Sequence, residues 1–151
     1  MLMDTNGHTI LSEDYCSYEV AKLLKEKGFP QEYDIYHSMV YNEEDYEDEY
    51  EVQRMVLETK LVKAGTLSSY PVGVPEPKCY CPTLQMAMKW LREVHNISVE
   101  PLVDFGSSDR YWWSADISYI KKDGLITTLS NYKSYEEAVE SALKYSLENL
   151  I

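Results

Sequence analysis

Three cysteines and three histidines are the side chains in this sequence with the chemistry to hold a metal or to act as nucleophiles. Cys79 and Cys81 are separated by one residue, and Cys16 and His95 could complete a ligand set. Structural zinc sites, however, usually pair their ligands across two to four residues and use four of them. We therefore interpret the cysteines as ordinary buried or loop thiols. The sequence predicts neither a metal site nor a cofactor.

The histidines have no recognisable catalytic partner. His95 falls near the end of a predicted helix, where the helix dipole favours an imidazole, so we interpret it as a capping residue. His8 and His37 stand alone, and no local motif supports a Cys–His nucleophile pair. The chain also has no G-x-S-x-G, no H-E-x-x-H and no Gly-rich phosphate loop. The sequence argues against an enzyme, and an undiagnosed activity stays as an alternative.

A dense run of carboxylates interrupts the middle of the chain. Seven of the nine residues from 43 to 51 are acidic, namely Glu43, Glu44, Asp45, Glu47, Asp48, Glu49 and Glu51. Like charges at this density oppose compaction, so we expect a solvated loop with an acidic surface. Mimicry of a phosphate ladder is the alternative. A calcium site is disfavoured because the spaced D-x-D-x-D-G pattern is missing.

The net charge of −12 excludes some partners. Residues 1–50 account for −10 of it. Such a chain should be repelled by nucleic-acid backbones and by anionic membrane surfaces, because both are bound through Lys and Arg. A basic protein partner, or no charged partner, is expected.

Aromatic residues are the most promising contact groups. Fourteen of the 151 residues are tyrosines, and Tyr and Trp bury a large area with few rotatable bonds. Tyr111, Trp112 and Trp113 fall on one predicted strand, so they must project to both faces of a sheet. If helices cover one face of the sheet, either Trp112 or Trp113 lies on the opposite face and could form a partner-binding platform. The alternative is that this tryptophan packs under residues 31–80. Tyr70 and Tyr80 could line the same groove.

A second hypothesis is a binder of a nucleotide-like small molecule at a pocket shared between subunits. It requires cationic side chains near the aromatic residues. The nearest candidates are Arg92, Arg110, Lys121 and Lys122.

Two helices should position these groups. The first spans about 18–27, between Ser17 as N-cap and Gly28 as the left-handed stop. The second begins after Thr83 (or Cys81) and ends near Asn96, and we expect the domain to be organised around it. The apolar residues of this second helix form one face and a second strip, and a helix that is apolar on two sides favours a homodimer. The face comprises Leu84, Ala87, Met88, Leu91 and Val94, and the strip comprises Met86 and Trp90.

The C-terminal part, 81–151, predicts an α-β-β-β-α core. Strands are expected at 97–105, with Pro101 marking an edge, at 111–120 and at 125–129, the last two joined by a tight Asp-Gly turn. Ser134 and Glu137 match a capping box that starts a helix reaching about Asn149. Its inner face should comprise Tyr135, Ala138, Val139, Ala142, Leu143, Ser146 and Leu150. The predicted fold class is α+β, an antiparallel β-meander flanked by helices.

Double-stranded-RNA-binding domains share this order of elements. We reject that function because their last helix opens with Lys and Arg, whereas this one opens with Glu136, Glu137 and Glu140.

The remaining residues complete a single domain, 1–151. Residues 1–13 are expected to form a leader with a short strand at 9–11. Residues 31–80 form a variable acidic and Pro-rich segment, in which 33–41 and 52–62 pair as strands; a helix over 49–62 is the alternative. An extended connector without regular structure is expected over 65–81.

Three blocks of the sequence, VAKLLKEKGF, CPTLQMAMKWLREVHNI and SYEEAVESALKYSLENLI, resemble a family of small uncharacterised proteins of gut Bacteroidetes and their phages and prophages. That family implies no assigned activity. The resemblance implies an accessory protein of a phage or mobile element that acts in a bacterial host cytoplasm. The absence of a secretory signal also predicts a cytoplasmic location. The leading functional hypothesis is a non-enzymatic protein that binds a host protein through an acidic, aromatic surface.

Overall fold

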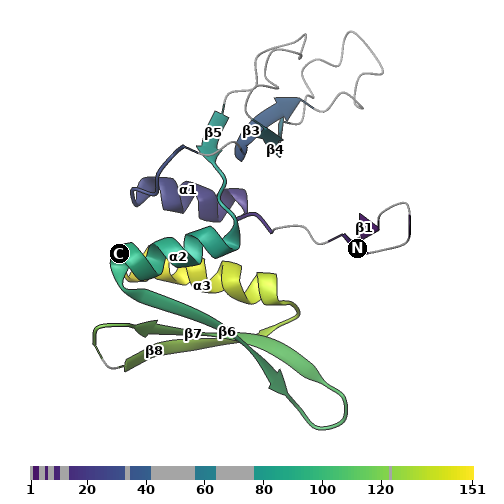
Figure 1. The fold of residues 1–151 in the computed structure, drawn as a ribbon, viewed down its shortest axis with the longest axis vertical. Coiled ribbons are helices and arrows are strands. Elements are labelled where there is room, and N and C mark those ends of the chain that lie inside the picture. Colours follow the sequence, from purple (N-terminus) through teal and green to yellow (C-terminus); the bar gives the residue numbers. More distant parts are fainter. Residues whose placement is uncertain are drawn as a thin grey trace.

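Helices α2 (Leu84–His95) and α3 (Tyr135–Asn149) lie on one face of an antiparallel sheet in the C-terminal part of the protein (Figure 1). The α+β class and the C-terminal α-β-β-β-α order confirm the sequence prediction. The computed structural model describes residues 2–3, 6, 9–10, 14–32, 35–41, 57–63, 77–122 and 124–151.

The sheet is a meander with β7 (Tyr111–Tyr119) between β6 (Ile97–Phe105) and β8 (Gly124–Tyr132). Its register runs from Ile97 opposite Tyr119 to Phe105 opposite Tyr111. Pro101 lies on the outer strand β6, as predicted, because an edge strand tolerates a residue without an N–H. The strand predicted at 125–129 is longer than expected and extends to Tyr132.

Helix α3 is the element around which the others pack. It contacts all three strands of the sheet and both other helices. Six of its side chains have essentially no exposed surface, namely Ala138, Val139, Ala142, Leu143, Ser146 and Leu147. Small side chains at 138, 142 and 146 repeat every four residues and therefore let a neighbouring element approach closely. The only polar side chain in this group, Ser146, donates its hydroxyl to the Ala142 carbonyl at 2.8 Å.

Helix α2, which we expected to be central, lies beside α3 and over β6. Four of its predicted inner residues are buried: Leu84, Ala87, Met88 and Leu91. Val94 was predicted to share that face and is instead 56% exposed, because the helix ends within one turn of it. Trp90 packs edge-on against Phe29 at 5.3 Å between ring centroids, so the apolar strip that suggested a homodimer is partly covered within the chain.

Helix α1 (Tyr18–Glu26) is bounded as the sequence predicted. The Ser17 hydroxyl accepts the Val20 N–H at 3.3 Å, and Gly28 has a φ of +92°. The chain before α1 is held against the start of α2, because Cys16 N–H donates to the Pro82 carbonyl and Leu84 N–H donates to the Asp14 carbonyl, each at 2.9 Å. Through these bonds the beginning of α1 is brought to the side of α3.

A second sheet has the order β4-β3-β5. Strand β3 (Ile35–Tyr41) pairs with β4 (Leu57–Lys63), which confirms the predicted pairing and excludes the alternative helix over the described residues 57–62. The expectation of no regular structure over 65–81 is wrong at β5 (Pro77–Tyr80), which also pairs with β3. Pro77 is tolerated there because it is the first residue of its strand.

Strand β2 (Thr9–Ile10) pairs with β1 (Leu2–Met3), so the short strand expected at 9–11 is present. None of the helices in the described part of the chain is long and apolar enough to cross a bilayer.

The packing of α3 predicts that Ala142→Leu will lower the free energy of unfolding by about 1–3 kcal/mol, because a fully buried site cannot accept the added volume without strain. Chemical denaturation would measure the change. Glu148→Leu is the matched control, because it places the same side chain at an exposed position of α3 and should change stability by less than about 0.5 kcal/mol. Equal effects of the two substitutions would contradict the central position of α3.

Candidate functional site

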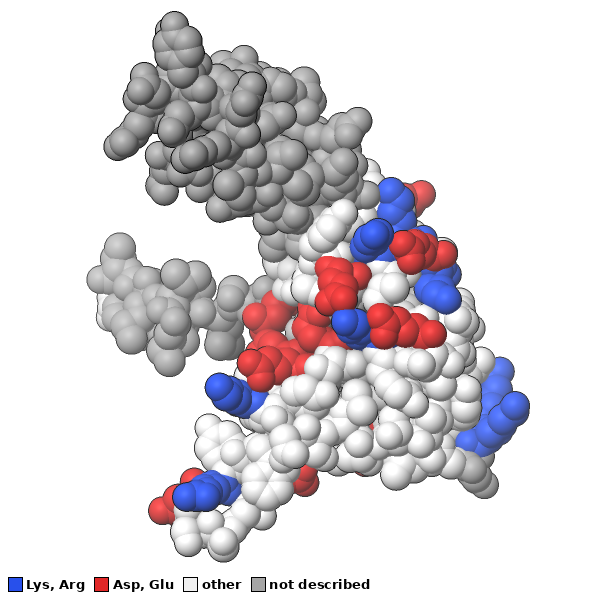
Figure 2. All heavy atoms as spheres, turned by 180° about the vertical axis from the view of Figure 1, so that it is seen from behind, with Lys and Arg blue, Asp and Glu red and all other residues white. Residues whose placement is uncertain are grey.

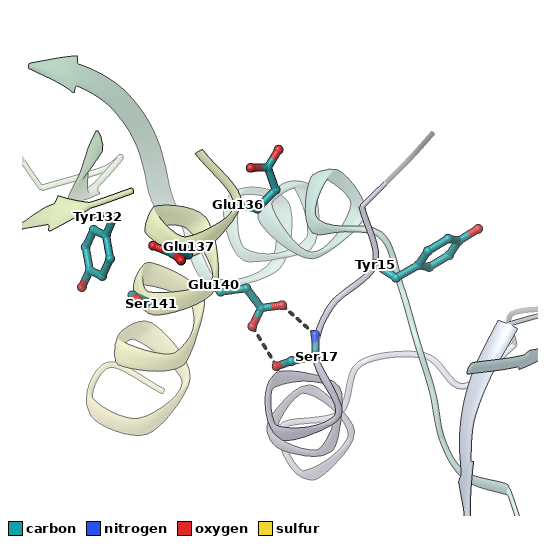
Figure 3. Close-up of a pocket in the computed structure, with 7 residues that line it drawn as sticks. All are labelled: Tyr15, Ser17, Tyr132, Glu136, Glu137, Glu140 and Ser141. Atoms are coloured by element: carbon teal, nitrogen blue, oxygen red, sulfur yellow. Dashed lines mark hydrogen bonds between the residues drawn. The ribbon is translucent and has the colours of Figure 1, made fainter. Parts of the chain in front are cut away.

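A hollow of about 490 Å³, open to solvent, lies at the start of α3 beside the start of α1 (Figure 3). We call it the α1–α3 hollow. Its lining combines two tyrosines, two serines and three carboxylates, and none of the lining residues is basic: Tyr15, Ser17, Tyr132, Glu136, Glu137, Glu140 and Ser141.

The carboxylates are placed by the first turns of α3. The Ser134 hydroxyl accepts the Glu137 N–H at 3.1 Å, which confirms Ser134 as the N-cap. The Glu137 carboxylate accepts the N–H of Lys133 at 3.0 Å, one residue before the N-cap position that a capping box would use. Glu136, Glu137 and Glu140 therefore project from one rigid helix end whose dipole favours negative charge.

Glu140 joins α3 to the start of α1. Its Oε1 accepts the backbone N–H of Ser17 at 2.6 Å, and its Oε2 accepts the Ser17 hydroxyl at 2.8 Å (Figure 3). Burial raises the pKa of the Glu140 carboxyl above its ordinary value of 4.5, although the two bonds from Ser17 favour the ionised form. Glu140 is thus a partly desolvated carboxylate whose two oxygens are both occupied by Ser17.

Negative charge accumulates around the hollow. Burial and the neighbouring Glu136 carboxyl raise the pKa of Asp14. Acidic side chains gather in one zone of the face shown in Figure 2. Lys144 does not neutralise Glu140, because its Nζ lies 2.6 Å from the Glu19 carboxylate. The hollow is therefore suited to a cation and unsuited to a phosphate.

The two tyrosines come from opposite parts of the chain. Tyr15 precedes α1, pairs through its backbone with Thr83 and is 38% exposed. Tyr132 ends β8, opposite Trp113. Tyrosine ring faces and carboxylates attract the same positive charge. Figure 3 shows the Tyr132 ring beside the first turns of α3 and the Tyr15 ring directed away from Glu140.

The predicted aromatic strand divides between the two sheet faces. Trp113 lies on the helix side and packs edge-on against Tyr135 at 5.6 Å. Trp112 lies on the other face and covers Gly106, where an added Cβ would come within 2.9 Å of the indole. Tyr111 is 63% exposed. Trp112 is half-buried, so the larger part of the expected platform is occupied by the β6–β7 turn.

The predicted cations do not converge within one chain. Arg110 precedes β7, whereas Lys121 and Lys122 follow it, and the nine residues of the strand separate them by about 30 Å. Arg92 is exposed on α2, and Lys122 Nζ lies 6.0 Å from the centroid of the Tyr119 ring. Tyr80 is half-buried, and its N–H donates to the Gln31 side chain. Tyr70 and the acidic run 43–51 lie outside the described residues.

All three cysteines are free and buried. The Cys81 thiol donates to the Cys16 carbonyl at 2.9 Å. Burial is the main cause that raises the pKa of all three thiols, to about 12 for Cys81. In the described part of the chain no group of His, Cys, Asp and Glu is arranged to hold a metal. All three thiols are removed from solvent, which agrees with their interpretation as buried groups.

His95 ends α2, but the helix is closed by Asn96, which adopts the left-handed conformation. The imidazole packs edge-on against Trp90 at 4.6 Å, and burial lowers its pKa. No described side chain forms a catalytic arrangement with it.

Comparison of this chain with known protein families, with curated proteins and with solved structures finds no match. The site must therefore be interpreted from its own chemistry. From the sequence, Glu136 and Glu140 served only to exclude RNA binding and Glu137 also completed a predicted capping box, whereas Tyr15, Tyr132 and Ser141 were not recognised. The sequence feature that could have indicated this site is the placement of Glu136, Glu137 and Glu140 within the first turns of the last helix.

The environment of Glu140 predicts a defined pH dependence. Because its folded-state pKa is raised, its protonated form favours the folded state, and that stability is lost as pH rises from below about 4.5 through the folded pKa. The stability of Glu140→Gln relative to the native chain should therefore increase across this window. Denaturation at a series of pH values tests this, with Glu148→Gln reporting the effect of net charge alone. A constant difference for Glu140→Gln would contradict the inferred burial.

The buried thiols predict slow modification. At pH 8 in the native protein, iodoacetamide should alkylate them on the order of 100-fold more slowly than after unfolding in urea, because the reactive thiolate is both inaccessible and disfavoured. Mass spectrometry of the labelled chain gives the rates. Rapid native labelling of any one cysteine would show that its thiol is a reactive group.

Proposed function

We propose that this protein is a non-enzymatic binding protein that receives a basic side chain of a protein partner in the α1–α3 hollow. One observation carries the proposal: two tyrosines and three carboxylates line a solvent-open hollow whose lining contains no Lys or Arg. A lysine or arginine of a partner would supply the missing positive charge.

The chemistry favours a guanidinium or an ammonium group over other ligands. Carboxylates offer several acceptor sites for N–H donors, and arginine can bind one carboxylate through two parallel bonds. The aromatic rings of Tyr15 and Tyr132 add cation–π attraction where a cation approaches a ring face. Contacts of this kind mainly determine which partner is accepted and how fast it associates, while affinity also requires apolar contact around them.

The position of Glu140 favours binding over catalysis. A partly buried carboxyl with a raised pKa can serve as a general acid in an enzyme. Here both oxygens of Glu140 accept hydrogen bonds from Ser17. The carboxylate therefore holds α3 to the N-terminal end of α1 and has no oxygen left without a bond for a substrate. Glu136 and the Glu137 oxygen that does not accept the Lys133 N–H remain to meet a ligand. A nucleotide-like ligand gains no support from the α1–α3 hollow, since its phosphates would face these carboxylates.

The identity of the partner as a host protein, the phage or mobile-element context and the cytoplasmic location come from the sequence resemblance. We propose them as the setting in which the hollow acts. The acidic, aromatic surface was expected at 43–51 and 111–113. We place the proposed binding surface instead at the beginnings of α1 and α3.

The proposal is tested first with a minimal probe. N-acetyl-arginine amide should shift the NMR signals of Ser17, Ser141 and the Tyr15 and Tyr132 rings, whereas N-acetyl-glutamine amide should not. Glu136→Gln/Glu137→Gln should weaken binding by about tenfold, since each rim charge contributes up to about 1 kcal/mol and 1.4 kcal/mol is tenfold. Glutamine at 137 can still accept the Lys133 N–H, which preserves the helix start.

A matched control separates local from global charge. Glu93→Gln/Glu148→Gln removes two carboxylates at exposed positions outside the hollow and should leave probe binding unchanged. A protein captured from a bacterial lysate should then show the same pattern: lost with the Glu136/Glu137 variant, retained with the control. Equal response to arginine and glutamine probes, or equal loss with both variants, would refute the proposed site.

A further inference from the structure

The ends of β6 and β7 form a two-stranded hairpin that extends beyond the helices (Figure 1). The third strand of the sheet does not reach it, because β8 ends at Tyr132, which lies opposite Trp113. Beyond that point β6 and β7 pair only with each other, as far as Phe105 opposite Tyr111. We call residues 102–105 and 111–113 the hairpin arm.

One face of the hairpin arm continues the helix side of the sheet. The pairing of β6 with β7 runs without a register shift, so alternate residues stay on the same face. Trp113 marks the helix side, because its ring contacts Tyr135 of α3. Val103, Phe105 and Tyr111 share this side, and they are 38%, 79% and 63% exposed. These three residues, which we call the arm face, are an apolar surface that no described helix covers.

The arm face itself carries no charge. Asp109 and Arg110 at the tip of the hairpin are opposite in sign. Asp104 lies on the other face of the arm, where it accepts the Ser114 hydroxyl at 2.7 Å. A ligand of the arm face therefore meets apolar side chains.

The base of the hairpin arm adjoins the start of α3, where the charge is negative. The charged side chains that line the α1–α3 hollow or lie next to it are four carboxylates and one exposed lysine: Asp14, Glu136, Glu137, Glu140 and Lys133. The carboxylates outnumber the lysine, so a ligand that spans both surfaces must be apolar over the arm and basic at α3.

We propose that the arm face is the apolar half of the partner-binding surface, and that the basic side chain received in the α1–α3 hollow belongs to an amphipathic helix packed on this face. The inference rests on the proposed function, because it assigns the partner of the same hollow. It supplies the apolar contact from which such a complex gains affinity.

The dimensions of the arm fit a helix. Two strands lie about 4.8 Å apart, and one helix about 10 Å wide covers them. Apolar residues three and four apart form a stripe along such a helix, and a basic residue one turn beyond the stripe can reach the carboxylates. An anionic membrane surface would be repelled by those carboxylates, and a second copy of this chain would bring a further net charge of −12.

Isothermal titration with a synthetic amphipathic peptide of about 15 residues, long enough to form a helix, tests the proposal. The peptide carries a leucine stripe, a glutamine face and one arginine a turn beyond the stripe. Phe105→Ala should weaken its binding about tenfold, because a large exposed ring is lost from the centre of the contact. Leu102→Ala is the matched control, because Leu102 is 41% exposed on the opposite face of the same strand, and it should leave binding unchanged.

The connection between the two surfaces is tested by a double-mutant cycle. Replacing the arginine of the peptide with glutamine should weaken binding to the native chain about fivefold, as expected for an ion pair at the rim of an interface. The same replacement should have no effect on binding to Glu136→Gln/Glu137→Gln. Independence of the two changes would overturn the inference.

N-acetyl-arginine amide distinguishes the two proposals, because it reaches only the α1–α3 hollow and should bind the native chain and Phe105→Ala equally. Failure of this probe on the native chain would refute the proposed function. Normal binding of the probe, together with equal peptide binding by Phe105→Ala and Leu102→Ala, would overturn the inference about the arm alone. Phe105-dependent binding of zwitterionic lipid vesicles without peptide binding, or a Phe105-dependent dimer in light scattering, would also overturn it.

Discussion

The fold depends on the burial of α3 between the meander and α1. A helix with six side chains fully removed from water needs apolar neighbours on more than one side. The sheet supplies Val99, Ala115 and Ile117, and α1 and α2 supply the remainder. Because protein interiors are close-packed, the buried side chains of α3 set how near its neighbours can come, and Glu140 and Lys144 mark the side of α3 that meets α1. The position of α1 then determines where the α1–α3 hollow opens.

Polar contacts along α1 and α3 fix their relative position. At one end, Glu140 accepts both the N–H and the hydroxyl of Ser17. In the middle, Lys144 meets Glu19, and at the other end Lys27 donates to the Ile151 carbonyl at 2.8 Å. The exposed pairs contribute little to stability individually. The Ser17–Glu140 contact matters more, because it places a carboxylate at a helix N-terminus, where the dipole favours negative charge.

The uneven distribution of charge limits where this protein can make specific contacts. The start of α3 concentrates carboxylates, while the β7–β8 turn carries lysines, and β8 runs uncharged between them. A strongly acidic protein is kept soluble by repulsion between its molecules. Specific contacts then form only where charge is locally absent or complementary. The carboxylates that line the α1–α3 hollow are one such place, where we propose that a basic group binds.

The sequence alone determined the features that depend on near neighbours. Ser17, Thr83 and Ser134 as helix caps, Gly28 and Asn96 as left-handed stops and the alternation of β7 act over a few residues, so their patterns predicted the α-β-β-β-α order correctly. Tertiary structure decided the rest. Glu140 bonds Ser17 across 123 residues, β5 forms only because β3 offers an edge, and Val94 is exposed because its helix ends there. No local pattern encodes the Glu140–Ser17 bond or the pairing of β5 with β3, and the α1–α3 hollow depends on contacts of this distant kind.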